Sequence, residues 1–551
     1  MSHPPSRSPA ADIAPLVLLS TVVTALVILT SDPAGDAPRS LEGPGLTLDE
    51  SFNVEEGVRL VTGLQEFTFG SLTLRQIFGE ESDLPIQPPL GYHNPDHPPL
   101  GRVWLGLFHS LSQSIHPVAD NPGPFVTLAA RTGSAVAFGL LVFIVGYTAN
   151  QWYGRAGGII AALSLVLMPR VFGHAHLAAL ETVIGLAYTV GVLSLASRWQ
   201  PARSVSTRTA IFTGCLFGLA LLTKIQAILL PIPVALWALW HGRHRAIVPL
   251  LLWAGAGLLL FFALWPWLWI DPVSHFREYL SRATERREVY VWYFGQRIAD
   301  HAVPWHYPAV MFLTTIPIGL QLFGLIGLGS RRCSLFKEPR EQLVLGCLVF
   351  PLLLFSLPGV AVYDGTRLFL VVFPLWAVFI GKGGAAALGW LRQRTSNKIA
   401  IPVMTLMLAA QGYGLFQLHP CYLSYYNVAV GGLRGADRLG LTTTYWRDSL
   451  TRSLLGETSR LLPAGATVVL VPVLHPAEVP TLLSQSPILR QRGIALRRWD
   501  EVADGKRKYV LVHRRQADIP PILEEMLPDA KVLAEVKRDG VQLAALYDLR
   551  P

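Results

Sequence analysis

Long apolar runs recur along most of this chain, and they constrain its fold more than any other feature. A helix needs about 20 apolar residues to cross the hydrocarbon core of a bilayer. Reading the sequence for such runs predicts about eleven membrane spans and therefore a polytopic α-helical membrane protein. The predicted spans lie near residues 13–30, 126–149, 157–172, 181–197, 209–223, 226–240, 246–265, 306–328, 342–357, 367–381 and 399–418.

The composition agrees with a membrane protein and excludes several other classes. Only 15% of the 551 residues are charged and 51% are hydrophobic, whereas a soluble domain carries about 25% charged residues. Disordered, collagen-like and coiled-coil chains are excluded by the same figures. The net charge of +9 is explained by basic loops that hold the protein in the membrane, so no nucleic-acid partner is expected. The four cysteines show no CxxC spacing and imply no disulfide framework.

The distribution of basic residues predicts the orientation. With the N-terminus in the cytoplasm, the inside segments hold 15 Lys/Arg and 3 Asp/Glu, whereas the first outside loop, 31–97, holds 3 Arg and 12 Asp/Glu. This is the positive-inside pattern. It predicts a multi-pass protein of the cytoplasmic (inner) membrane, whose odd number of spans places the C-terminal domain outside. Leu100–Ile115 is short and interrupted by Arg102, so it is expected to be an interfacial or re-entrant helix.

Two parts are predicted. Residues 1–435 form a transmembrane domain whose first external loop, 31–98, includes an amphipathic helix near Ser51–Phe69. Residues 436–551 form a small extracytoplasmic α/β domain. In that domain Ala466–Pro472, Tyr509–His513 and Val541–Tyr547 are expected to be strands, and Ala477–Ser484 and Ile519–Met526 helices.

Candidate catalytic residues lie in the first external loop. Asp49 and Glu50 are adjacent carboxylates, and Asp96 and His97 precede Pro98-Pro99-Leu100-Gly101. An acidic pair on a surface is commonly a solvated face or a favourable charge at a helix N-terminus, and two prolines simply set an extended backbone before a helix. The alternative is that these side chains are held above the bilayer for chemistry.

These motifs, taken in order, resemble the protein O-mannosyltransferase family and its bacterial relatives, the lipid A aminoarabinose transferases, over about residues 10–435. The resemblance is carried by Asp49-Glu50, by His97-Pro98-Pro99-Leu100-Gly101 and by five later segments. Glu181 stands where the family commonly has Asp, and His97 stands where the aminoarabinose transferases have Lys. The later segments are Arg170–His176 with Glu181, Leu222-Thr223-Lys224, Pro304–Tyr307, Tyr363–Phe369 and Pro420–Gly432.

The resemblance implies a GT-C glycosyltransferase that moves a sugar, a mannose-like hexose or a pentose, from a polyprenyl phosphate to an acceptor hydroxyl outside the membrane. An anionic phosphate leaving group needs no general acid, but the acceptor needs a base. Asp49 is assigned as that base in a single inverting displacement, and Glu50 as its partner that positions the acceptor or tunes Asp49.

Cations at the outer ends of spans suit the lipid phosphate. Lys224 and Arg367 are assigned to it, in preference to the alternative that they snorkel to lipid headgroups. His97 and Asp96 are assigned to donor binding, and His174, His176 and Glu181 are further candidates at the external mouth. No cofactor is certain, and a divalent cation held by histidines and carboxylates stays open beside plain structural histidines.

Two other functions remain open. A lipid or glycan transporter or flippase would also have many spans, although no similar halves are visible. A non-catalytic assembly subunit would be expected to lack the acidic pair or Arg367. The expected partners are the polyprenyl-linked sugar, membrane lipid, and an acceptor that is a protein, a lipid or a glycan.

Overall fold

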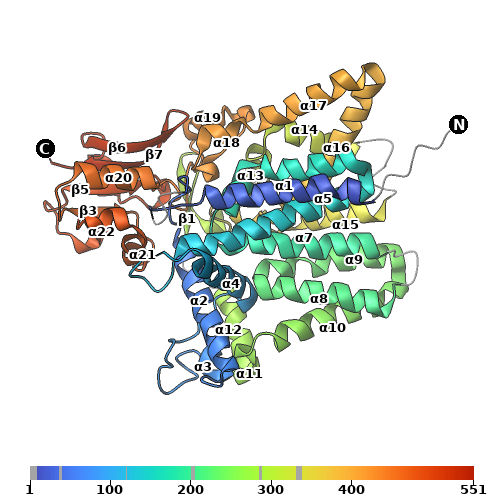
Figure 1. Cartoon of the computed structure of the whole chain (residues 1–551), viewed down its shortest axis with the longest axis horizontal. Coiled ribbons are helices and arrows are strands. Elements are labelled where there is room, and N and C mark those ends of the chain that lie inside the picture. The colour runs from blue at the N-terminus through green and yellow to red at the C-terminus, as the bar shows by residue number, and fades with distance from the viewer. Residues whose placement is uncertain are drawn as a thin grey trace.

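The structure is a computed structural model that describes residues 9–35, 40–118, 121–199, 205–284, 288–329 and 338–550. Figure 1 shows helices lying side by side in a bundle, with a small β-sheet unit at one end of it. We call this end of the bundle the domain end. The first eight residues, on which the predicted cytoplasmic N-terminus falls, lie outside the described residues.

Every predicted span is helical, and the predicted fold class is confirmed. By length and composition, five helices of the described residues can cross a membrane, or six if one bent pair forms a single span. That pair is α13 and α14, which meet at 110°. Shorter apolar helices and the halves of longer ones account for the other predicted spans. The bundle helices are α1 (Pro9–Leu29), α5 (Thr127–Val166), α7 (Leu180–Arg198), α8 (Thr207–Thr223), α9 (Pro231–Gly242), α10 (Ile247–Ala263), α13 (Tyr307–Thr314), α14 (Ile318–Gly329), α15 (Pro339–Leu354), α16 (Val372–Arg394) and α17 (Asn397–Gln411).

The long helix α5 is two predicted spans joined by a tight reversal. Gly154 breaks it with φ 78° and ψ 175°, a conformation that glycine adopts without steric cost. A Cβ added to Gly158 would lie 2.7 Å from the carbonyl oxygen of Gly146. In one straight helix these residues would be about 18 Å apart. The chain therefore folds back on itself at Gly154, in agreement with the predicted loop at 150–156.

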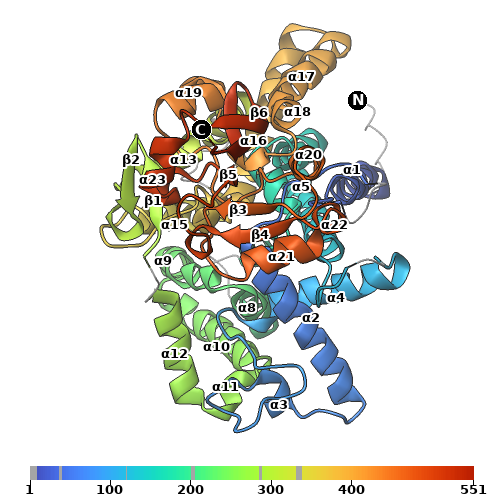
Figure 2. The ribbon, with the colours of Figure 1, turned by 90° about the vertical axis from the view of Figure 1, so that its left-hand side faces the viewer.

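Several helices lie across the end of the bundle. In Figure 1, α2 (Leu48–Thr68) runs at right angles to α1, and Figure 2 shows α4 (Pro99–Ile115) lengthwise although it is nearly end-on in Figure 1. The predicted helices at Ser51–Phe69 and Leu100–Ile115 are thus confirmed, and both are oriented crosswise. Near them lie α3 (Leu74–Phe78), α11 (Trp267–Ile270) and α12 (Pro272–Thr284).

Two glycines bring α2 and α4 into backbone contact. A Cβ on Gly57 would lie 2.3 Å from the carbonyl oxygen of Arg102, and one on Gly106 would lie 2.1 Å from that of Gly57. Only glycine allows so close a crossing. The crossing holds the loop before α4, with Asp96 and His97, near the helix that carries Asp49 in its first turn.

The C-terminal unit is a five-stranded sheet of order β4-β3-β5-β7-β6. Strands β3, β4 and β5 are parallel, while β7 is antiparallel to β5 and β6. Its strands are β3 (Thr467–Val471), β4 (Ala495–Arg498), β5 (Tyr509–His513), β6 (Lys531–Arg538) and β7 (Val541–Asp548). Its helices are α20 (Arg452–Leu461), α21 (Glu478–Gln485), α22 (Pro487–Gln491) and α23 (Pro521–Met526).

Three short segments connect the bundle to this sheet domain. The antiparallel strands β1 (Tyr290–Tyr293) and β2 (Gln296–Ala299) form a hairpin before α13. Helices α18 (Tyr413–Leu418) and α19 (Gly432–Arg438) follow α17. The predicted boundary at residue 435 falls inside α19 and stays a prediction.

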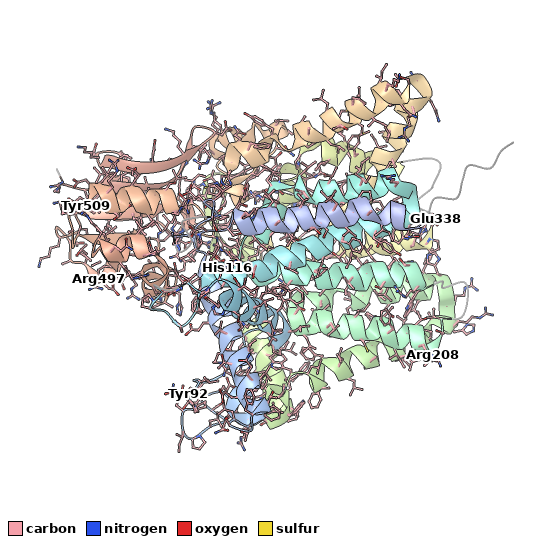
Figure 3. The ribbon with its side chains drawn as sticks, in the orientation of Figure 1. Tyr92, His116, Arg208, Glu338, Arg497 and Tyr509 are labelled. Atoms are coloured by element: carbon pink, nitrogen blue, oxygen red, sulfur yellow. The ribbon has the colours of Figure 1, made fainter. Side chains whose placement is uncertain are left out.

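The labelled side chains of Figure 3 mark the two ends of the bundle. Arg208 and Glu338, both from predicted inside loops, lie at one end, whereas Arg497 and Tyr509 of the sheet domain lie at the other. Two of the predicted inside loops therefore lie at the end opposite the predicted outside domain.

Candidate active site

Four residues singled out from the sequence meet at the domain end of the bundle. The Arg367 guanidinium contacts the Asp49 carboxylate through Nη2, and its Nε lies 2.9 Å from Oε1 of Glu181. The Lys224 ammonium lies 2.5 Å from the same Glu181 oxygen. We call Asp49, Glu181, Lys224 and Arg367, together with Asp364 described below, the charged cluster.

Helix ends place these side chains. Asp49 is in the first turn of α2 and Glu181 in the first turn of α7, where carboxylates are stabilised by the helix dipole. Lys224 directly follows the last residue of α8, where a cation is favoured for the same reason. Arg367 begins a short 3-10 turn, Arg367–Phe369, that leads into α16.

Asp364 completes the cluster through a sharp turn before Arg367. Its Oδ2 lies 3.1 Å from Nη1 of Arg367. The turn needs two residues with positive φ, Asp364 at 54° and Gly365 at 64°. A Cβ on Gly365 would lie 2.7 Å from Nη1 of Arg170, so glycine lets this turn sit directly on a buried arginine. The sequence motif Tyr363–Arg367 was noted for its arginine, and its aspartate was not assigned a role.

Aromatic side chains form a wall beside the cluster. The Arg367 guanidinium lies 4.5 Å from the centre of the Trp446 ring, a cation–π distance. The His174 ring meets the edge of Trp446 with centroids 5.2 Å apart, and its Nε2 lies 3.4 Å from the Tyr445 hydroxyl. Burial lowers the pKa of His174 to about 4, so this imidazole is neutral at pH 7.

Burial raises the pKa of the Asp49 carboxyl above its usual value. Arg367 and Lys224 oppose the rise, while the carboxylates of Glu181 and Asp364 add to it. A carboxylate with a raised pKa is a stronger base than one on the surface. Asp49 also remains 19% exposed, whereas Glu181 is 2% exposed, so Asp49 is the more accessible of these two carboxylates.

Glu50 points away from the cluster and is fully engaged elsewhere. Its two oxygens accept hydrogen bonds from Nε and Nη2 of Arg131, each at 2.8 Å. It also accepts from the backbone N–H groups of Thr47 at 2.9 Å and Ala178 at 2.7 Å. The Thr47–Glu50 contact is a capping box that begins α2. Arg131, buried and bonded to three backbone carbonyls as well, was not singled out from the sequence.

The remaining candidates lie beside the cluster rather than in it. The Asp96 carboxylate is 54% exposed and lies 3.4 Å from Arg282, and His97 lies in the loop that precedes α4. His176 is buried between the Thr30 hydroxyl, 2.9 Å away, and the Phe172 carbonyl, 2.8 Å away. These contacts give His176 a structural role. His174 and His176 do not converge on one point.

One group of the described residues has the spacing of metal ligands, and it is not the group of histidines expected from the sequence. Oxygen or nitrogen atoms of Glu80, His275 and Glu278 lie within 4.8 Å of one another. The Arg282 guanidinium occupies part of this space, 2.8 Å from Glu80. Arg282 therefore neutralises part of the charge of these carboxylates, and none of the three residues belongs to the charged cluster.

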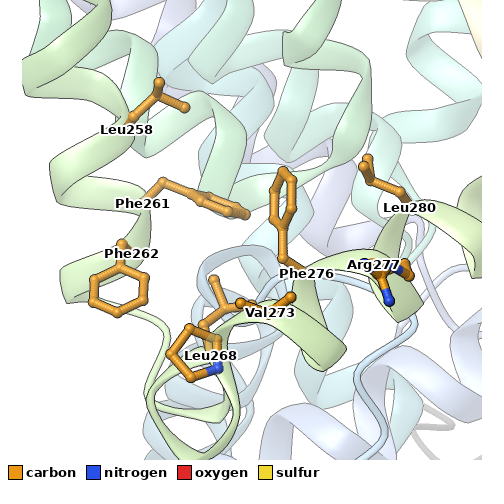
Figure 4. A pocket seen from close by; sticks show the side chains of 9 residues that line it. Leu258, Phe261, Phe262, Leu268, Val273, Phe276, Arg277 and Leu280 are labelled. Atoms are coloured by element: carbon orange, nitrogen blue, oxygen red, sulfur yellow. The ribbon is translucent and has the colours of Figure 1, made fainter.

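An apolar groove opens on the outside of the bundle beside these crosswise helices. Figure 4 shows Leu258, Phe261 and Phe262 of α10 facing Val273 and Phe276 of α12. The groove has a volume of about 480 Å³, and Arg277 lies at its rim. Apart from Arg277, the residues that line the groove are apolar, so its surface is of the kind that an alkyl chain would cover.

Residues 96–270 match the family model described as dolichyl-phosphate-mannose-protein mannosyltransferase. The predicted resemblance is confirmed. The chain is a glycosyltransferase, and its fold is polytopic and helical with a small C-terminal sheet domain. The matched stretch is shorter than half the chain and includes Asp96, Glu181 and Lys224. No curated protein matches the chain.

Several solved structures are similar at low identity. ArnT from Cupriavidus metallidurans bound to undecaprenyl phosphate is 13% identical, with 98% of each chain covered and a TM-score of 0.48. The Pmt1-Pmt2 protein O-mannosyltransferase complex of S. cerevisiae bound to the sugar donor is 16% identical, over 50% of this chain and 38% of that one, with a TM-score of 0.33. The oligosaccharyltransferase AglB from Archaeoglobus fulgidus is 11% identical, over 92% and 70%, with a TM-score of 0.46.

Proposed function

We propose that this glycosyltransferase moves a sugar from a polyprenyl phosphate to an acceptor hydroxyl, with Asp49 as the general base. The single observation that carries the proposal is the convergence of Asp49, Arg367 and Lys224 at the domain end of an apolar bundle. A base and two cations are the groups that this reaction needs. The acceptor O–H loses its proton to Asp49, its oxygen attacks the anomeric carbon, and the phosphate leaves as an anion.

The cations are arranged to receive the departing phosphate. Arg367 offers five N–H donors in a planar fork, and Lys224 offers three on a point charge. Each Arg367 nitrogen meets one carboxylate, and Glu181 takes one Lys224 hydrogen, so donors of both cations are left for phosphate oxygens. The groove of Figure 4 is assigned to the polyprenyl chain, which covers its apolar side chains.

Other residues orient the sugar and hold the base. The second oxygen of Glu181, Oε2, is buried and has no hydrogen-bond partner among the described residues. A buried acceptor without a partner is costly, and a sugar hydroxyl would satisfy it. His174 offers a neutral imidazole beside the cluster. Asp96 and His97 are assigned to the approach of the donor, while Glu50 is assigned to fixing the start of α2 rather than to the chemical step.

The reaction is proposed to take place on the extracytoplasmic side of the inner membrane. Nucleotide sugars are confined to the cytoplasm, so an external transferase needs a donor that has crossed the bilayer on a lipid. The charge asymmetry of the loops supports this side. The sheet domain lies on the same side as the cluster, where a protein, lipid or glycan acceptor would arrive.

The test is consumption of radiolabelled polyprenyl-phosphate sugars by membranes that contain the enzyme. We expect Asp49→Asn to insert normally and to lose transfer by a factor of about 10² to 10⁴, the usual contribution of a general base. Glu55→Gln is the matched control, because Glu55 is an exposed carboxylate on the same helix. Full activity of Asp49→Asn would remove Asp49 as the base, and transport without transfer by the wild type would favour a flippase.

A further inference from the structure

The sheet domain reaches into the charged cluster through one arginine. Arg515 follows β5 and is 5% exposed. Its Nη1 donates a hydrogen bond to Oδ1 of Asp364 at 2.7 Å, and its Nε lies 2.5 Å from Asp518. Asp364 uses its other oxygen for Arg367. Charges therefore alternate without interruption from Asp518 of the sheet domain to Asp49 of the first loop.

The same arginine also holds the aromatic wall. Nη1 of Arg515 donates a second hydrogen bond to the carbonyl oxygen of Tyr445, 2.5 Å away. Trp446, the next residue, lies against the Arg367 guanidinium. Arg515 thus fixes the Asp364 carboxylate on one side of Arg367. It also fixes the backbone of Tyr445, next to Trp446, whose ring lies on another side of Arg367. The pose of Arg367 relative to Asp49 depends on both.

Residues just beyond Trp446 contact the segment before α2 and so help to place Asp49, the partner of Arg367. The Gly45 N–H donates to the Asp448 carbonyl at 2.7 Å, and Nε of Arg447 donates to the Leu46 carbonyl at 3.3 Å. A Cβ on Gly45 would lie 2.4 Å from the Leu450 carbonyl oxygen. This packing sets the start of α2, where Asp49 lies. Arg447 in turn is paired with Glu478 of α21 at 2.7 Å.

We propose that the sheet domain is a component of the active site, in which Arg515 is a positioning residue that aligns Arg367 against Asp49 through Asp364 and Tyr445. This inference rests on the proposed function of the charged cluster. It predicts that the transmembrane part alone cannot reach full activity, whatever the acceptor. It also explains why a buried arginine of the sheet domain that already pairs with Asp518 has a second carboxylate partner in the loop before α16.

The test compares full-length Arg515→Gln with wild type in lipid nanodiscs, using a radiolabelled polyprenyl-phosphate sugar. We expect kcat to fall on the order of tenfold to a hundredfold with the donor KM changed by less than about threefold, because a misplaced catalytic group lowers the rate of the chemical step. Without Arg515, Asp364 pairs with Arg367 alone and pulls its guanidinium away from Asp49. The other charged neighbours of Asp49 are Glu181 and Lys224. The carboxyl of Asp49 then holds its proton more tightly, and the acid limb of kcat/KM moves to higher pH.

Two variants separate positioning from mere stability. Arg514→Gln is the matched control, because Arg514 is the adjacent arginine, 34% exposed and paired with Asp437 away from the cluster; we expect wild-type kinetics. Arg515→Lys keeps the charge with fewer contacts and is expected to recover part of the lost kcat. Hydrogen exchange of residues 360–370 is expected to rise in Arg515→Gln and to stay unchanged in Arg514→Gln.

The inference is overturned if Arg515→Gln keeps the wild-type kcat. It is equally overturned if activity falls only in proportion to the folded fraction, with the acid limb and the exchange of 360–370 unchanged. If wild type consumes no polyprenyl-phosphate sugar, the proposed function fails instead. The exchange comparison then still decides whether Arg515 holds the loop that carries Arg367.

Discussion

At the scale of single residues, the adjacent carboxylates Asp49 and Glu50 lie in different surroundings. Asp49 faces a cation and remains partly exposed, whereas Glu50 is fully buried against Arg131. The sequence places both on one helical turn, where successive side chains are rotated by about 100° about the helix axis. A pair read from the sequence as one catalytic unit therefore separates into a base and a structural anchor.

This separation predicts the behaviour of Glu50→Gln. The change leaves the Arg131 guanidinium buried with a neutral partner, and breaking a buried ion pair costs about 3–5 kcal/mol. We expect a lower free energy of unfolding and a lower midpoint of thermal unfolding in detergent, with the activity per folded molecule near that of wild type. Glu55→Gln should change stability by less than about 0.5 kcal/mol. Loss of transfer at unchanged stability would instead make Glu50 a catalytic residue.

Sequence reasoning found the residues of the cluster that carry family motifs and missed those that only tertiary contacts bring in. Glu181, Lys224 and Arg367 each stand at a predicted span end, and Asp49 lies in the first external loop, so all four are predicted on the same membrane side. Arg131 lies inside a predicted span, and Arg515 lies far along the chain in another domain. Periodicity describes the faces of one element, and it carries no information about which distant charge an element will meet.

At the scale of elements, the strands that were predicted are the central ones and those that were missed are the edges. β3, β5 and β7 are apolar and buried, so their composition marks them. β4 reads Ala-Leu-Arg-Arg, and β6 carries four charged residues. Edge strands are commonly charged because charge discourages pairing with another strand. A search for apolar runs therefore does not detect them.

The crossing of α2 and α4 gives a prediction at this scale. Gly106→Ala would place a methyl group 2.1 Å from the Gly57 carbonyl oxygen, so the two helix backbones must separate. Overpacking of this kind costs about 1–3 kcal/mol, and it would move Asp49 relative to the loop with Asp96 and His97. We expect a lower unfolding midpoint together with reduced transfer.

The control for this change is Gly255→Ala in α10. Gly255 has nothing within 4 Å of an added Cβ, and alanine is the better helix former by about 1 kcal/mol. That variant should be as stable as wild type or more so, with normal transfer. Equal behaviour of the two variants would show that the α2–α4 crossing does not position the site.

At the scale of the whole molecule, the fold sorts the predicted loops between two ends, and the charged cluster shares its end with the sheet domain. The proposed donor follows from which end is outside. If the domain end faced the cytoplasm, a nucleotide sugar could reach Asp49 directly and no lipid carrier would be required. The sidedness of the molecule therefore decides between two donor classes that the geometry of the cluster alone would accept.

Single cysteines in a cysteine-free background test this sidedness. Arg497→Cys in the sheet domain and Arg208→Cys at the opposite end both replace exposed residues, and Figure 3 shows them at the two ends of the bundle. We expect a membrane-impermeant maleimide to label Arg497→Cys in intact spheroplasts and Arg208→Cys only after permeabilisation, because the basic loops stay inside. The reverse pattern would place Asp49 in the cytoplasm. A lipid-linked donor would then lose its rationale, while the roles of Asp49, Arg367 and Arg515 within the site would still stand to be tested with a soluble one.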